Sequence, residues 1–288
     1  MKTLSALSFA VTLFPVLCGA AVNVVEFDSS PEGKARYLSQ PYYWWGRGKF
    51  PVKPGERGRI VSLTNARAKY VFFLFGREDA DGAWHPAIGM LKPSRANWGA
   101  TDFLNFSFGK KKAMKDCAVS LETTSENGFA LKFTAPGYEA KCSFEIREND
   151  DRLYMLFSAS ADTGVRLTCY PSSYAVNYRA GKELRKRYAV TNLRRIPMGT
   201  KVPLSEKEYS VFLGDSHFDP AENRGEGPCG VIYDPAKMKA TLSVQNYSCT
   251  FLFSGKGEMP VVLFDFHNAS NKEGERIMRE LPVTITKK

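Results

Sequence analysis

Apolar and polar residues alternate with a period of two along most of the chain. The segments GFALKFTA at 128–135 and KCSFEIRE at 141–148 place a large apolar or sulfur-containing side chain at every second position. The pattern recurs at 153–157, 165–169 and 240–244. Successive side chains of a strand point to opposite faces of a sheet, so this alternation predicts strands with one buried face.

Turn-forming residues separate these segments at short intervals. The turn signals are ENG at 126–128, APG at 135–137, ENDD at 148–151, ADTG at 161–164 and YDPAK at 233–237. Glycine, proline, asparagine and aspartate favour turns because they adopt or pre-set the required backbone angles. We therefore expect many short strands joined by tight connections.

Two segments are apolar on both faces, YVFFLFG from Tyr70 and PVVLFDF from Pro260, and both predict central strands. About fifteen strands in one chain predict an all-β fold, a large two-sheet antiparallel β-sandwich. In strand count and size the pattern resembles the galactose-mutarotase-type supersandwich shared by some epimerases, lyases and hydrolases. The His–Glu motif of the epimerases is not identifiable, so the resemblance implies no residue roles.

One short helix is predicted near the C-terminus. Ser270 and Glu273 form an S-x-x-E capping box, and Pro282 ends the segment. The apolar stripe between them consists of Ile277, Met278 and Leu281.

The first twenty residues predict a cleavable secretory signal. Residues 1–20 contain one lysine near the start, an apolar run and small residues at the end. The run is shorter than the roughly 20 residues of a spanning helix, so no integral membrane segment is expected. The mature protein is expected to be secreted or extracytoplasmic. Residues 21–288 contain no linker or repeat and are expected to form a single β-sandwich domain.

Cysteines and charge narrow the picture further. Five cysteines follow residue 20, none with metal-site spacing, and an oxidising compartment makes one or two disulfides plausible. Cys142 and Cys169 lie at inward strand positions and are alternatively small core residues. The formal net charge of +10 favours an anionic partner such as an acidic polysaccharide, or simply maintains solubility. Without a recognition motif, nucleic acid is not expected. The oligomeric state is open.

The segment GDSHFDPAENRGEGPCG at 214–230 is the richest in chemistry. The alternation of the strand before this segment continues through Asp215, His217 and Asp219. The Asp-x-His spacing of Asp215 and His217 recurs at Asp265 and His267. Two such strand ends at one rim could hold a metal, calcium if carboxylates dominate and zinc if both histidines contribute. The metal candidates are Asp215, His217, Asp219 and His267. The alternative is an irregular turn-rich loop.

Catalytic candidates come from two segments. A glycosidase needs two carboxyl groups, for which Asp215, Asp219, Glu222 and Glu226 are the first candidates, with His217 beside the first two. Tyr174 and Arg179 suggest a second chemistry. A Tyr–Arg pair with a nearby histidine can abstract the proton α to a uronate carboxylate, since arginine neutralises the carboxylate. Neighbouring tyrosine and arginine side chains are equally common as packing contacts without a catalytic role.

Substrate-binding candidates are aromatic and basic. Trp84 and Trp98 stand beside glycine, proline or asparagine and are expected to be exposed, where they could stack on sugar rings. Arg185 and Arg187 lie in a basic run and could bind carboxylate or sulfate, or form a solvated face.

Three functions therefore stand. The first is a secreted carbohydrate-binding or carbohydrate-processing sandwich whose partner is an acidic polysaccharide. The alternatives are a non-catalytic structural or surface-adhesion protein, and a polysaccharide lyase acting by β-elimination on a uronate. Convergence of the candidate residues at one place in the fold would favour the first.

Overall fold

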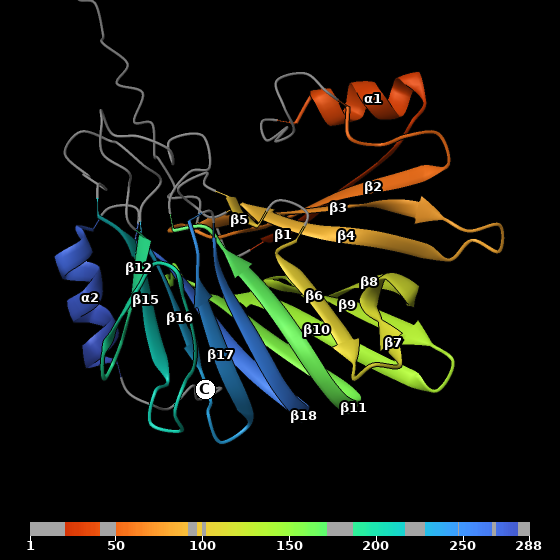
Figure 1. Cartoon of the computed structure of the whole chain (residues 1–288). Helices are drawn as coiled ribbons and strands as arrows, with labels where there is room; N and C mark the ends of the chain where they lie inside the picture. The colour runs from red at the N-terminus through yellow and green to blue at the C-terminus, as the bar shows by residue number, and fades with distance from the viewer. Residues whose placement is uncertain are drawn as a thin grey trace, which may run out of the picture.

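The computed structural model describes residues 21–40, 50–91, 97–99, 102–171, 187–216, 228–246, 248–266 and 269–281. Over these ranges the chain forms two antiparallel β-sheets, of five and thirteen strands, and two α-helices (Figure 1). The predicted all-β sandwich is confirmed.

The first sheet has the order β1-β2-β3-β4-β5. Its bounds are β1 Ala21–Asp28, β2 Glu56–Thr64, β3 Lys69–Glu78, β4 Trp84–Leu91 and β5 Asn97–Gly99. The segment from Tyr70 forms the central strand β3, as predicted. Its inward residues join the main core, while Val71 and Phe73 pack on the opposite face with Phe27 and Tyr37. The sheet is therefore buried on both sides at its centre.

The second sheet has the order β13-β12-β15-β16-β18-β11-β10-β9-β8, with β17 and β6 pairing along β18 and β11. The bounds are β6 Leu104–Phe108, β7 Lys112–Ala113, β8 Ala118–Ser125, β9 Gly128–Ala135, β10 Tyr138–Ile146, β11 Leu153–Cys169, β12 Arg187–Thr191, β13 Arg195–Pro197, β14 Thr200–Pro203, β15 Ser210–Asp215, β16 Cys229–Tyr233, β17 Met238–Val244 and β18 Cys249–Asp265. A 3-10 turn, η1, spans Met114–Asp116.

Strands β11 and β18 are bent, so that the two halves of the thirteen-stranded sheet lie over each other. Their register shifts between Ala159 and Thr163. Phe106 pairs opposite Val165 in the second half of β11, yet its ring centroid lies 5.1 Å from that of Phe157 in the first half. The strand pair therefore folds back over itself. The predicted turn at 161–164 is wrong, because a bulge inside continuous strands makes the bend.

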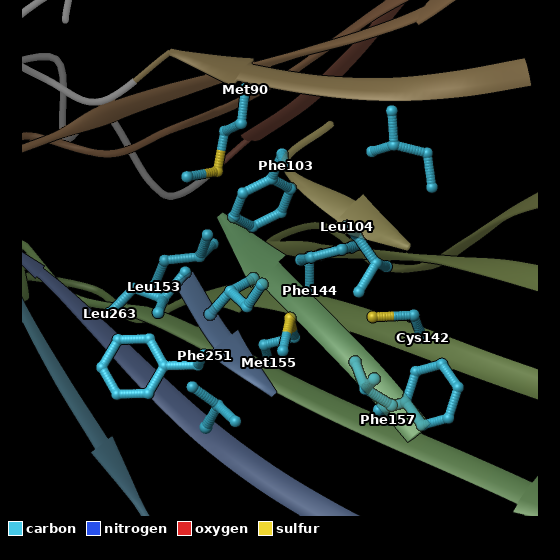
Figure 2. Packing of buried hydrophobic residues seen from close by; sticks show 14 of the residues in the cluster. Met90, Phe103, Leu104, Cys142, Phe144, Leu153, Met155, Phe157, Phe251 and Leu263 are labelled. Carbon is cyan, nitrogen blue, oxygen red and sulfur yellow. The ribbon is translucent and has the colours of Figure 1, made fainter. Parts of the chain in front are cut away.

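Side chains from both sheets meet in one interior (Figure 2). Met90 of the first sheet lies near Phe103, while Phe144, Met155 and Phe251 reach the same space from the second sheet. Most of these are large apolar residues at alternate strand positions. The period-two prediction is confirmed in these strands.

Both helices lie on the outer faces of the sheets. Helix α2 spans Asn271–Glu280, and the Ser270 side chain accepts a hydrogen bond from the Glu273 N–H, as predicted. Helix α1, Pro31–Leu38, was not expected, although Ser30 caps it. No described helix has the length and apolar character required to cross a membrane.

The five cysteines are buried thiols rather than disulfides. Cys117, Cys142, Cys169, Cys229 and Cys249 all lie within the main core. The expectation of disulfides is wrong, and the alternative of small core residues is confirmed. Burial raises the pKa of the Cys142 thiol well above its usual value.

Candidate functional site

The inward-facing side chains of the strands are apolar along most of their length, but at one end of the sandwich they are ionisable. Val211 and Leu213 of β15 lie in the core, and Asp215 follows with the same direction, as the sequence predicted. Leu263 of β18 is likewise followed by Asp265. Both aspartates therefore point toward the interior where the apolar core stops.

Strand register brings these ends together. Arg187, the first residue of β12, pairs opposite Asp215. Cys229, the first residue of β16, pairs opposite both Leu213 and Asp265. Arg187, Asp215 and Asp265 are 2%, 1% and 5% exposed, and we call these three residues the polar end. The expected convergence of Asp215 and Asp265 at one rim of the sandwich is confirmed.

Burial controls the chemistry of the polar end. It lowers the pKa of Arg187, while the neighbouring Cys249 and Asp215 act in the opposite direction. Burial also raises the pKa of Cys249 to about 12, against the effect of Arg187. The pKa of Tyr70 is raised well above its usual value, first by burial and then by Asp265. Tyr70 and Cys249 are therefore protonated at neutral pH, Tyr70 near Asp265 and Cys249 near the Arg187 guanidinium, which stays charged.

Helix α2 fixes the end of β15. The Asn271 side chain donates a 2.7 Å hydrogen bond from Nδ2 to the carbonyl oxygen of Asp215. Because Asn271 is the first residue of α2, the helix and the strand end are positioned together.

A cleft of about 700 Å³ adjoins Asp265, between the connection from β10 to β11 and helix α2. This volume lies within the usual range for ligand sites. Its wall contains the arginines Arg67, Arg147 and Arg152 and the acids Glu148, Asp150 and Asp151. Sequence reasoning missed this cleft, because its residues come from separate strands and from a turn that was assigned no function.

Internal contacts orient the arginines of the cleft. The Arg147 guanidinium lies 3.8 Å from the ring centroid of Tyr154, and Arg152 donates two hydrogen bonds from Nε to Asp150. Burial alone would raise the pKa of Asp150, but hydrogen bonds from Arg152 and Tyr154 hold it below its usual value. A carboxylate and two guanidinium groups are thus held in place before any ligand arrives.

Two substrate-binding candidates are less accessible than expected. Trp84 is 4% exposed, its Nε1 donates to the carbonyl oxygen of Arg57, and the Arg59 guanidinium covers its ring at 4.6 Å. The expectation that Trp84 is exposed is wrong, because it occupies an inward position of β4. Arg187 belongs to a buried strand rather than to a solvated basic loop.

The other candidates lie outside the described residues. These are His217, Asp219, Glu222, Tyr174, Arg179, Arg185, His267 and the side chain of Trp98. Segment 172–186 directly precedes Arg187, and segment 217–227 follows Ser216, so both adjoin the polar end in sequence. Within the part of the chain that is described, no three His, Cys, Asp or Glu side chains form a metal-binding group.

Comparison with known proteins identifies no family. No family model matches the chain, and no curated protein matches it. Among solved structures, a 4-alpha-glucanotransferase from Thermococcus litoralis aligns with 72% of this chain at 10% identity and a TM-score of 0.31. This chain covers 37% of that chain. A likeness at this level carries no argument about function.

Proposed function

We propose that this protein is an exported carbohydrate-active β-sandwich that binds and processes an acidic polysaccharide in the cleft beside the polar end. The observation that carries the proposal is the burial of Arg187, Asp215 and Asp265 at one edge of the sheet where the apolar core stops, with Asp265 also lining a cleft of ligand size. Carboxylates accept hydrogen bonds from sugar hydroxyls, and arginines bind carboxylate or sulfate groups through two N–H donors. The formal charge of +10 also favours an anionic polymer.

The cleft gives the proposal a direct test. Affinity electrophoresis of the chain lacking residues 1–20 would compare polygalacturonate and alginate with neutral dextran, at low and high salt. We expect retardation by the acidic polymers that weakens as salt rises, because exposed charge contacts are screened over about 8 to 10 Å. Binding to dextran alone, unchanged by salt, would contradict the proposal.

Single substitutions test where on the protein the polysaccharide binds. Arg147→Ala should weaken binding of acidic oligosaccharides about tenfold, the effect of losing about 1.4 kcal/mol. Arg77→Ala, an exposed arginine on β3, removes the same charge away from the cleft and is the matched control. Equal losses in the two variants would show that net charge alone drives binding.

A companion assay separates binding from cleavage. Formation of an unsaturated uronate from polygalacturonate, followed by its absorbance, reports β-elimination. We expect Tyr174→Phe and Arg179→Ala to abolish any such signal while the proteins stay folded. Binding without this signal, and without new reducing ends, would identify a non-catalytic binding protein instead.

A further inference from the structure

A second cleft lies at the bend of β11 and β18, midway along both strands, whereas the polar end includes Asp265 at the C-terminal end of β18. It has a volume of about 650 Å³ and is lined by residues of β11, β17 and β18 and by the segments around Ser205 and Pro235. Three lysines and two acids line it. We call this site the lysine trough and define it by Lys237, Lys239, Lys256, Asp162 and Glu206.

Small residues form the floor of the lysine trough. Strand register aligns Ser107, Gly164, Ser254 and Lys239 in one row across β6, β11, β18 and β17. A Cβ atom added at Gly164 would have the Ser107 hydroxyl, 3.9 Å away, as its nearest neighbour. The space next to Gly164 is therefore open, which lets a ring-shaped ligand approach the backbone.

The lysines of the trough are available for a ligand. Lys237, Lys239 and Lys256 are exposed, and none makes an ion pair with any residue in the described ranges. Ammonium groups gathered around one hollow attract anions more strongly than the same charges spread over a surface. Asp162 and Glu206 repel a carboxylate or sulfate but accept hydrogen bonds from hydroxyls.

We propose that the lysine trough is a second subsite that binds an anionic saccharide unit, with its carboxylate or sulfate toward the lysines and its hydroxyls toward Asp162 and Glu206. The ligand class rests on the proposed function, but the site is separate from the polar end. A long acidic polymer would engage both sites, and the linked contacts would raise its apparent affinity.

The test uses oligosaccharides too short to reach both sites. Isothermal titration calorimetry with tetrasaccharides of polygalacturonate and of heparin separates the carboxylate from the sulfate. Wild-type protein should bind two equivalents of the preferred saccharide. Gly164→Leu should fill the open space of the lysine trough without changing its charge, so that the variant binds one equivalent of saccharide. The pair Lys239→Glu and Lys256→Glu should do the same, whereas Lys34→Glu with Lys53→Glu, an equal charge change on exposed lysines outside the trough, should not.

The outcomes separate the two proposals. One equivalent in wild-type protein, unchanged by Gly164→Leu and lost in Arg147→Ala, overturns the lysine trough and leaves the cleft beside the polar end as the binding site. One equivalent lost in Gly164→Leu and unchanged in Arg147→Ala supports the trough and overturns the assignment of binding to the cleft beside the polar end. If neither tetrasaccharide binds to wild-type protein, both proposals are overturned. Melting temperatures equal to wild type confirm that each variant is folded.

Discussion

The buried carboxylate of Glu208 illustrates how one side chain can hold several loops between strands in place. Its side chain is 3% exposed and accepts hydrogen bonds from the Ser205 N–H at 2.8 Å, the Thr191 hydroxyl at 2.9 Å and the Arg194 Nε at 2.9 Å. Burial alone would raise the pKa of Glu208, but these hydrogen bonds hold it below its usual value. The folded protein therefore favours the ionised form.

Glu208→Gln should lower the free energy of unfolding by about 2 kcal/mol at pH 7, since hydrogen bonds to a charged group are lost. Because the folded pKa lies below the unfolded one, the stability from ionised Glu208 is present above the unfolded pKa and is lost as pH falls through the folded pKa. Urea unfolding at pH 7 and near pH 3 should show a smaller difference between variant and wild type at the lower pH. Glu206→Gln, at an exposed neighbour, is the control. A difference that grows on acidification would refute the argument.

At the scale of elements, helix α2 depends on a glycine. A Cβ atom at Gly274 would lie 2.5 Å from the Cε2 atom of Phe212, whose ring is fully buried on the outer face of β15. Alanine has the higher helix propensity by about 0.8–1 kcal/mol, so Gly274→Ala would stabilise an isolated helix. In the folded protein the clash should reverse the sign.

Gly274→Ala should therefore destabilise the protein by about 1–3 kcal/mol in urea unfolding. Lys272→Ala, at an exposed position of the same helix, should stay within about 0.5 kcal/mol of wild type. A stabilised Gly274→Ala variant would show that α2 moves away from Phe212 without cost.

Local pattern predicted the strands and α2 but not the bend in β11. Alternation identifies which face of a strand is buried, and it is preserved on both sides of the shift between Ala159 and Thr163. Nothing in a local pattern indicates that the two halves lie in opposite layers, since that follows from contacts such as Phe106 with Phe157. Helix α1 had a signal, Ser30 followed by Pro31 and Glu32, but its apolar stripe is too short to stand out.

At the scale of the whole molecule, the core between the two halves of the bent strands should carry much of the stability. The Phe106 ring lies 4.8 Å from Phe133 and 5.1 Å from Phe157, between centroids, and is 2% exposed. Phe106→Ala should cost about 3–5 kcal/mol in urea unfolding. Leu252→Ala, at a position 36% exposed on the outer face, should cost less than 1 kcal/mol. Similar losses in both variants would contradict a shared interior.

The candidate site was only partly predictable for the same reason. Asp215 and Asp265 continue the alternation of their strands, so their inward direction could be predicted, and their meeting at one rim was proposed from the matching spacing. Arg187 gave no such signal, because its basic neighbours resemble a solvated segment. Arg147 and Arg152 flank a turn, and only the three-dimensional arrangement places them beside helix α2.

The pairing of β11 with β18 also governs when the fold can form. β18 spans residues 249–265 of 288, and its partner β11 begins about a hundred residues earlier. A chain that emerges N-terminus first cannot complete the thirteen-stranded sheet until β18 has appeared, because that strand is hydrogen-bonded to β11, β16 and β17. Such distant pairing makes folding slow, and the waiting strands expose unpaired edges. The thirteen-stranded sheet therefore stays incomplete until most of the chain has emerged.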